Sequence, residues 1–483
     1  MKKTMVIQGN LASETPLTQK DKVPMRGKIA FGLGGFAEVL MSNAVLSLAL
    51  PIYNIGFGLS PILVGYAIGI PRLWEAITDP LFGNITDNTR SAWGRRRPYI
   101  FVGVIIASIL FAIMWMPPSN LSQTSLFVYF LTVSILYFTA YTIFIVPWTA
   151  LGFELTSDYN ERTRVMAYKT FFGSVGGTLF LPWIYKMCFW LGPDKNELVG
   201  VRIVAVFFGL LMICTGILPA IFCKENTQSQ SQPKIPIVKA FKFPLTNKPF
   251  LMICGTILLM IMAIFLVNPF GMYLNIYYIF GGDKAAGATM QAIGGAIYGV
   301  IGMGSVPFVS YLGTHLGKKR TLLLGECVVI LASLSTWFIV TPTYPYLQLV
   351  YAMMVSFGMT CVWVLTASMI ADVCDLDELK SGLREEGMYS AIMAMLFKSG
   401  YAGVIVLSGY MLRLSGFDIE LKASQVPQTI LNMRILFIVG PVVCVGMAIL
   451  CTSLYPITEK RAVEGRRVLN ERKKSANIKS ESL

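Results

Sequence analysis

Long apolar stretches separated by short polar gaps form the dominant pattern along this 483-residue chain. A membrane-spanning helix needs about 20 mostly apolar residues. Stretches of that kind lie at 29–50, 60–86, 98–116, 124–151, 167–190, 201–223, 249–280, 287–313, 321–341, 345–374, 387–414 and 430–456. The pattern therefore predicts an all-α polytopic membrane protein with twelve transmembrane helices.

Basic residues gather in every second gap between these stretches. Arg95-Arg96-Arg97 follows the second stretch and Lys318-Lys319-Arg320 follows the eighth, whereas the gaps 51–59 and 117–123 carry no charge. Loops rich in lysine and arginine stay in the cytoplasm. We therefore expect both termini and every even-numbered gap on the cytoplasmic side. The alternation agrees with the number of stretches, since one missed helix would reverse its phase.

A polar stretch of low complexity, residues 224–248, divides the chain into two halves. Gly94-Arg95-Arg96-Arg97 in the first half has a similar segment in the second half, Gly317-Lys318-Lys319-Arg320, which indicates a weak internal repeat. Two parallel six-helix repeats with the site between them describe the major facilitator architecture. The expected divisions are an N-terminal tail, two six-helix bundles joined by a cytoplasmic linker, and a basic tail: 1–28, 29–223, 224–248, 249–456 and 457–483. No cleaved signal peptide is expected in the first 28 residues, because they lack a short apolar core.

Composition supports a membrane protein. Only 14% of the residues are charged and 55% are hydrophobic, whereas soluble domains carry about 25% charged residues. The net charge of +14 is explained by the cytoplasmic gaps, so no nucleic-acid partner is expected. Nine scattered cysteines and the single histidine, His315, favour neither a disulfide framework nor a histidine metal centre. The chain has no nucleophile–base arrangement, so an enzyme is not expected either.

The second stretch carries three charges on one helix face, Arg72, Glu75 and Asp79. A charge near the bilayer centre costs roughly 2.5–3.5 kcal/mol, so we expect these side chains to face the protein interior or a water-filled path. Two carboxylates about 4 Å apart would repel by roughly 4 kcal/mol at an effective dielectric constant of about 20. The pair must therefore hold a proton, bind a cation or be neutralised by the positive charge of Arg72. The structural alternative is a buried Arg72–Glu75 pair with Asp79 only hydrogen-bonded.

Four segments of the chain carry motifs of a known family. The first is Arg72-Leu73-Trp74-Glu75-Ala76-Ile77-Thr78-Asp79-Pro80-Leu81-Phe82-Gly83, followed by Trp93-Gly94-Arg95-Arg96-Arg97-Pro98, and it resembles the helix 2 signature of the glycoside–pentoside–hexuronide:cation symporters. The other three segments resemble helix 4, helix 10 with its exit, and helix 11: Tyr141-Thr142-Ile143 before Pro147-Trp148; Trp363-Val364-Leu365 before Ala371-Asp372 and Asp375; Phe397-Lys398-Ser399-Gly400. The resemblance spans nearly the whole chain.

The resemblance implies a cation site and a substrate site. Acids at the positions of Glu75 and Asp79 ligate the coupling cation in that family, Na⁺ or H⁺, and a hydroxyl at the position of Thr142 adds an oxygen. Six further residues are candidates for substrate binding, each with packing, an internal ion pair or a gate role as the alternative: Glu38, Arg72, Trp148, Lys169, Trp363 and Lys398. No cofactor or resident metal is expected beyond the transported cation.

Two positions depart from the family pattern. The aspartates of helices 1 and 4 that are important for sugar correspond to Val39 and Ile145 here, and Glu38 is the nearest acid on the first stretch. Because sugar hydroxyls are usually held by carboxylates, this difference weakens the implication of a melibiose-type substrate. Glu38 either compensates from the cavity or pairs with a base in the other half.

Charged residues at the ends of the second and tenth stretches have two interpretations. One is topology with contacts to lipid phosphates. The other is a cytoplasmic gate, in which arginines of one half meet acids of the other and close the inner side during rocking of the halves. The candidate gate residues are Asp87, Arg90, Arg95, Arg96, Asp372 and Asp375.

The expected function is cation-coupled symport of a sugar, glycoside or sugar acid by alternating access. The protein is expected to be a monomer in the cell membrane, the inner membrane in a bacterium, in contact with lipid and a small-molecule substrate. One alternative is a symporter of a lysolipid or another amphiphile, which a wide apolar opening between the fifth and eighth stretches would favour. Another alternative is a membrane sensor that kept the fold and lost transport.

Overall fold

The computed structural model describes residues 22–225 except 157, residues 247–418 except 382–385, residues 425–458, residue 421 and parts of 461–471. Every regular element of the described residues is a helix, as the apolar pattern predicts. Most of the predicted tails, 1–28 and 457–483, and of the predicted linker 224–248 lies outside the described residues.

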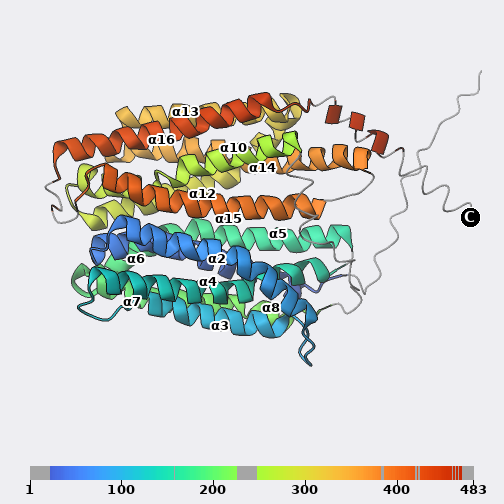
Figure 1. The fold of residues 1–483 in the computed structure, drawn as a ribbon, viewed down its shortest axis with the longest axis horizontal. Coiled ribbons are helices and arrows are strands. Elements are labelled where there is room, and N and C mark those ends of the chain that lie inside the picture. The colour runs from blue at the N-terminus through green and yellow to red at the C-terminus, as the bar shows by residue number, and fades with distance from the viewer. Residues whose placement is uncertain are drawn as a thin grey trace, which may run out of the picture.

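The first half of the chain forms a group of long helices, which Figure 1 shows in the lower part of the view with roughly parallel axes. The elements are α1 (Met25–Ala49), η1 (Leu50–Gly56), α2 (Pro61–Asn88), α3 (Arg97–Met114), α4 (Gln123–Glu154), α5 (Tyr159–Val175), η2 (Gly176–Phe180), η3 (Leu181–Trp183), α6 (Ile184–Leu191), η4 (Pro193–Lys195), α7 (Glu197–Gly216) and α8 (Leu218–Phe222).

The second half lies in the upper part of the same view (Figure 1). Its elements are α10 (Lys248–Phe265), α11 (Asn268–Tyr273), η6 (Leu274–Ile279), α12 (Lys284–His315), α13 (Lys318–Ile339), η7 (Pro345–Gln348), α14 (Leu349–Ser381), α15 (Glu386–Leu414) and α16 (Pro427–Leu454). In the described part of the chain, ten helical segments are long and apolar enough to cross a membrane. Neither α2, with its charged residues, nor the run from α5 to α6, with its polar start, is among them.

The two halves meet tightly at one end of the molecule, which we call the far end and which contains Pro61, the first residue of α2. Glycines allow the close approach, since a Cβ atom at Gly409 of α15 would lie 2.6 Å from the carbonyl oxygen of Pro61. On the other side of the interface, a Cβ atom at Gly299 of α12 would lie 2.4 Å from the hydroxyl oxygen of Thr178. Helix packing therefore joins the two halves on both sides of the interface, at the far end and at the middle of α12.

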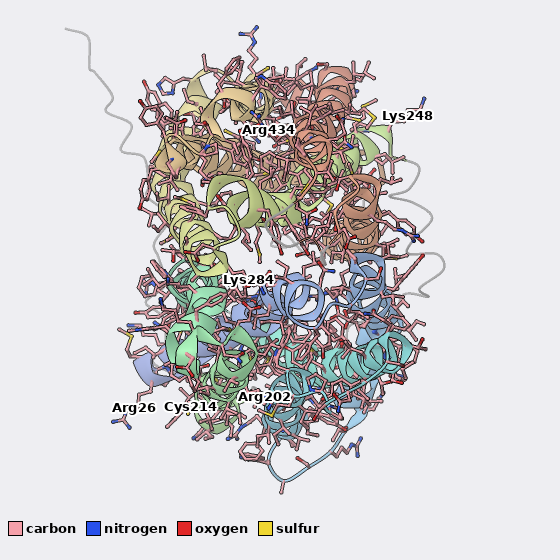
Figure 2. The ribbon with its side chains drawn as sticks, turned by 90° about the vertical axis from the view of Figure 1, so that its left-hand side faces the viewer. Arg26, Arg202, Cys214, Lys248, Lys284 and Arg434 are labelled. Carbon is pink, nitrogen blue, oxygen red and sulfur yellow. The ribbon has the colours of Figure 1, made fainter. Side chains whose placement is uncertain are left out.

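Polar contacts join the halves at the far end as well. The Tyr273 hydroxyl donates to Asn54 Oδ1 over 2.5 Å. Lys284 Nζ lies 2.5 Å from Glu197 Oε1, and Figure 2, a view from this end, shows Lys284 at the boundary between the halves. A third contact joins the hydroxyls of Tyr66 and Tyr410 over 2.7 Å.

At the opposite end, which we call the basic end, two ion pairs of the described residues each stay within one half. This end carries the loop of residues 89–96. Lys28 pairs with Glu161 over 2.5 Å, and Lys318 pairs with Asp372 over 2.5 Å. Beyond Gly299 toward this end, α12 is exposed around most of its circumference, and Tyr311 is 57% exposed. These contacts describe a molecule whose halves are joined at the far end and separate toward the basic end.

Candidate functional site: a charge cluster between α2 and α15

Arg72 and Glu75 are the buried part of the charged face of α2. Glu75 is fully buried and Arg72 is 8% exposed. Arg72 Nη1 donates to Glu75 Oε1 over 3.2 Å, and Arg72 Nη2 donates to the carbonyl oxygen of Ser42 over 2.6 Å. The guanidinium also lies 4.3 Å from the centroid of the Phe138 ring. Arg72 is thus held by α1, α2 and α4 together, and its charge is compensated by Glu75.

Lys398 brings a second positive charge to the acid pair from the other half of the molecule. Its Nζ lies 3.1 Å from Glu75 Oε2 and also contacts Asp79 Oδ2. Asp79 and Lys398 are each between a quarter and a third exposed, so the protein does not enclose this side of the cluster completely. Two acids are therefore balanced by two bases, and the lysine is the one that crosses between the halves.

Hydroxyl groups complete an oxygen-rich cluster around Asp79. Thr142 Oγ1 of α4 donates to Asp79 Oδ1 over 3.0 Å. Thr142 Oγ1 also lies 3.3 Å from Thr78 Oγ1 of α2. Carboxylate and hydroxyl oxygens are ligands that suit hard cations. Thr78 is not among the candidates predicted from the sequence, although its place beside Asp79 in the helix 2 motif is a signal.

The remaining candidate substrate residues lie in two places. Lys169 Nζ lies 4.7 Å from the centroid of Trp148, which is fully buried and stacks on Phe31 with ring centroids 5.0 Å apart. Trp363 is 45% exposed and packs on Phe397, the neighbour of Lys398, with centroids 5.6 Å apart. Trp363 therefore packs on the segment of α15 that carries Lys398, whereas Trp148 lies in the core of the first half.

Glu38 connects these two places. It is half-buried on α1, and its carboxyl group is near the side chain of Tyr141, the residue before Thr142. Its carboxyl group is near the charges of both Lys169 and Arg72. Both bases belong to the first half, the same half as Glu38, whereas one predicted alternative was a base in the other half.

The candidate gate residues are engaged mainly within their own halves in this structure. Arg96 contacts Asp87 over 2.9 Å, and Arg95 contacts Glu154 over 3.2 Å. The Asp372–Lys318 pair stays within the second half, Arg90 is exposed, and Asp375 is half-buried. A gate between the halves stays a prediction about another conformation, because Arg95, Arg96 and Asp372 are not joined across the halves here.

Two acids that bind the arginine-rich turn at the basic end are not among the residues predicted from the sequence. Glu154, the last residue of α4, pairs with Arg95 and Arg96. Glu225 accepts hydrogen bonds from the backbone N–H groups of Arg95, Arg96 and Arg97 over 2.8, 2.8 and 3.2 Å. The arginine-rich turn is thus fixed to the end of α8 and to α4.

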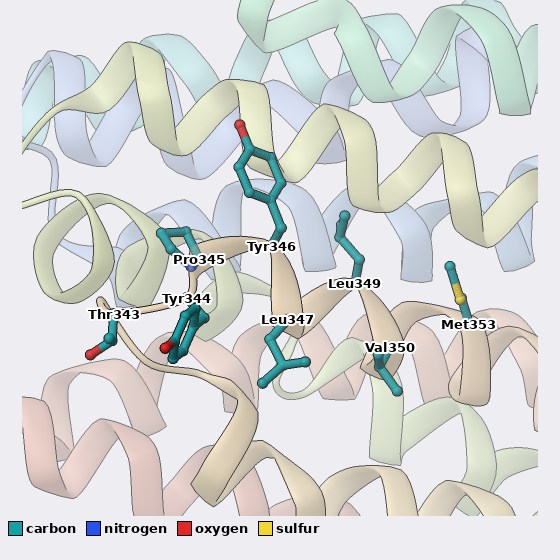
Figure 3. Close-up of a pocket in the computed structure, with 8 residues that line it drawn as sticks. All are labelled: Thr343, Tyr344, Pro345, Tyr346, Leu347, Leu349, Val350 and Met353. Atoms are coloured by element: carbon teal, nitrogen blue, oxygen red, sulfur yellow. The ribbon is translucent and has the colours of Figure 1, made fainter.

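A cavity of about 680 Å³ lies apart from the charge cluster, around η7 and the start of α14. Figure 3 shows the residues that line it, which are Thr343, Tyr344, Pro345, Tyr346, Leu347, Leu349, Val350 and Met353. Its lining contains no charged residue and none of the candidate site residues.

Similarity to known proteins identifies the family to which the chain belongs. A profile of the family described as MFS/sugar transport protein matches residues 30–459. A symporter of Synechocystis, itself uncharacterised, is 25% identical over 95% of this chain and 99% of its own. The putative glycoside/cation symporter YagG of Escherichia coli is 26% identical over 92% of this chain and 94% of its own. The sodium-dependent lysophosphatidylcholine symporter 1 of Xenopus tropicalis is 23% identical over 93% and 90%.

A solved structure shares the fold. It is a bacterial homologue of the human lysosomal transporter Spinster in an inward-facing, unoccupied conformation, with a TM-score of 0.65 and 16% identity over 89% of this chain and 98% of that chain. The predicted resemblance to glycoside–cation symporters is confirmed by the relatives, which are transporters and not enzymes. The chain therefore belongs to the MFS/sugar transport protein family, whose members are multi-pass membrane transporters.

Proposed function

We propose that this protein couples the transport of a sugar, glycoside or sugar acid to Na⁺ or H⁺. The observation that carries the proposal is the contact of Lys398 of α15 with the acid pair of α2, because it places one charge cluster across the two halves. Glu75, Asp79, Thr78 and Thr142 supply the oxygens for the cation.

Coupling follows from the charge balance of this cluster. A cation that binds Glu75 and Asp79 replaces the ammonium group of Lys398, which is then left without its carboxylate partners. An unpaired charge in a partly buried site is unfavourable. A substrate that accepts hydrogen bonds from Lys398, through hydroxyl or carboxylate oxygens, removes that penalty. Cation and substrate therefore bind together more favourably than either binds alone.

The proposal includes a topology of twelve transmembrane helices in two six-helix bundles, in a monomer with both termini in the cytoplasm. Basic residues at the gaps after α2 and α12 and at the start of α1 support it, since they lie at one end of the molecule. The far end would then face outward, and the separated basic end would face the cytoplasm. Site-directed labelling of loop residues from either side of the membrane tests this orientation.

Thermal unfolding of the purified protein tests the cation site. Na⁺ at constant ionic strength, or a lower pH, is expected to raise the unfolding temperature, and a transported sugar is expected to raise it further. Asp79→Asn and Glu75→Gln should remove the cation effect. Asp194→Asn is the control, because Asp194 is an exposed acid outside the cluster. If both cluster variants keep coupled uptake, the site assignment is wrong.

An amphiphile such as a lysolipid is the second candidate substrate. Apolar side chains face outward on α12 beyond Gly299 and on α5, where Phe171 is 57% exposed. Val39, at the position of a sugar-binding aspartate in the resembling family, packs against α5, with Cγ2 3.3 Å from the Cβ position of Gly173. Cation-dependent stabilisation by lysolipids in the absence of any response to sugars would favour this candidate.

A further inference from the structure

A buried carboxyl group lies in the second half, outside the charge cluster. Glu326 of α13 is fully buried. Its Oε1 accepts a hydrogen bond from Thr452 Oγ1 of α16 over 2.6 Å, and that hydroxyl lies 3.0 Å from Thr256 Oγ1 of α10. Glu326 Oε2 has no hydrogen-bond partner among the described residues. One acid thus joins three helices through two hydroxyl groups.

The charged groups nearest along the same helix are engaged elsewhere. Lys318 pairs with Asp372, and Lys319 Nζ donates to the carbonyl oxygens of Ser453 and Tyr455 over 2.7 and 2.9 Å. Within the described residues, no ion pair reaches Glu326.

Thiols are the ionisable groups that face this region from the neighbouring helices. Cys451 of α16 is close enough to Glu326 to interact with its charge. Cys361 of α14 packs on Gly325, with Sγ 3.0 Å from the Cβ position of that glycine. α12 ends with His315, which is exposed and lies on the Tyr311 ring, and α10 contributes the uncharged Thr256. None of these groups supplies a positive charge to the Glu326 carboxyl.

We propose that Glu326 is a proton-binding site, separate from the cation site, that is occupied when α10, α13 and α16 are packed together. A buried carboxylate without a base is far less favourable than a neutral carboxylic acid. In the neutral form Oε1–H donates to Thr452 Oγ1, because a hydroxyl both accepts and donates. The Thr452 hydrogen then turns to Thr256 Oγ1. Loss of the proton leaves a carboxylate with Thr452 as its donor and weakens the contact of the three helices.

This site matters for any measurement that varies pH to distinguish Na⁺ from H⁺ coupling. Protonation of Glu75 or Asp79 and deprotonation of Glu326 would both change the behaviour of the protein with pH. Glu75 and Asp79 belong to the proposed coupling site, whereas Glu326 does not. The proposal for Glu326 therefore does not depend on the coupling site.

Infrared spectroscopy and thermal unfolding of the full chain test the proposal. We expect a C=O band of a protonated carboxylic acid at neutral pH, which Glu326→Gln removes and which Thr452→Val shifts, because the hydrogen-bond partner is lost. We also expect the unfolding temperature of the unmodified protein to fall, relative to that of Glu326→Gln, as the pH rises from the usual glutamate pKa of about 4.3 toward neutral, because in that range the acid ionises in the unfolded chain but not in the folded one. Glu464→Gln is the control, since Glu464 is exposed.

Two results would overturn the proposal. One is a neutral-pH spectrum in which Glu326→Gln and the unmodified protein have the same carboxylic acid band. The other is loss of that band on addition of Na⁺ at constant pH in a Glu75→Gln background, which would make Glu326 a sodium ligand. If Glu326→Gln does not fold, Thr452→Val still decides: an unchanged band frequency contradicts the hydrogen bond from the neutral acid.

Discussion

At the scale of single residues, Lys398 competes with the coupling cation for the same carboxylates. Lys398→Gln should lower the free energy of unfolding in cation-free buffer by about 1–3 kcal/mol, less than the roughly 3–5 kcal/mol of a fully buried pair, because the lysine is partly exposed. The stabilisation by Na⁺ or protons should become larger than in the unmodified protein, since the acid pair has lost its internal partner. Thermal unfolding with and without the cation measures both effects.

The control for this prediction is Lys195→Gln, which changes an exposed lysine outside the cluster. A cation effect of unchanged size in Lys398→Gln would show that the lysine does not occupy the cation site.

Glu161 gives a prediction about acid stability. It lies in the polar first turn of α5, where burial alone would raise the pKa of its carboxyl group, but Lys28, the backbone N–H of Val23 and Arg164 lower that pKa below its usual value. A carboxyl whose pKa is lower in the folded chain adds stability above the unfolded value, about 4.3 for glutamate, and this stability is lost as the pH falls through the folded value.

Glu161→Gln should therefore destabilise the protein at neutral pH by about 1–3 kcal/mol, the usual range for a buried group that loses its partner. The difference from the unmodified protein should shrink in buffers more acidic than the usual glutamate pKa. Unfolding temperatures across that pH range provide the measurement, with Asp194→Asn at an exposed acid as the control. A difference that stays constant through the acid range would contradict the ion-pair explanation.

The sequence was sufficient to find Arg72, Glu75 and Asp79, because their spacing on an apolar helix is visible without a fold. It also named Lys398 but left its partner open, since a contact between residues 79 and 398 exists only after the halves meet. Trp148 shows the same limit: its motif suggested substrate contact, while the structure places it between Phe31 and Phe144. Burial depends on neighbours that no local pattern specifies.

At the scale of elements, close contact of α2 and α15 depends on glycines. Gly409→Leu would place a side chain against the rigid backbone of Pro61, 2.6 Å from its carbonyl oxygen. We expect a loss of about 1–3 kcal/mol in stability, the usual range for overpacking, together with reduced transport. Gly403→Leu is a matched control on the same helix, because a Cβ atom there meets nothing within 4 Å.

Unfolding temperatures and uptake rates of the two leucine variants provide the comparison. Equal behaviour of Gly409→Leu and Gly403→Leu would mean that the far-end contact contributes nothing to the folded state or to its function.

The apolar pattern predicted the positions of helices better than the irregularities within them. The second predicted stretch, 60–86, agrees closely with α2. The pattern did not predict that the first helix continues as a π-helix at Leu50–Gly56, which contains Pro51, or that a short 3-10 turn with Pro182 interrupts the fifth stretch. Such irregularities depend on which backbone groups find partners, as in the hydrogen bond from Asn54 Nδ2 to the carbonyl oxygen of Leu59.

At the scale of the whole molecule, contacts between the halves are unevenly distributed. Far-end contacts such as Asn54–Tyr273 cross between the halves, whereas the pairs of Arg95, Arg96 and Asp372 at the basic end do not. Two halves that rock around a central site must exchange one set of contacts for the other. The sequence predicts a gate at the basic end but not the far-end contacts, because the residues that make those contacts lie far apart in the chain and share no motif.

The Glu197–Lys284 pair allows a direct test of the far-end contacts, because both partners can be exchanged. Glu197→Lys or Lys284→Glu alone places like charges together, so each should speed amide hydrogen exchange at η1 and the start of α12 and lower stability by about 1 kcal/mol, as expected for a partly exposed pair. The double exchange restores opposite charges and should return both quantities toward those of the unmodified protein. A double variant whose effects are the sum of the single ones would show that the two residues do not interact, and the far end would then be closed by helix packing alone.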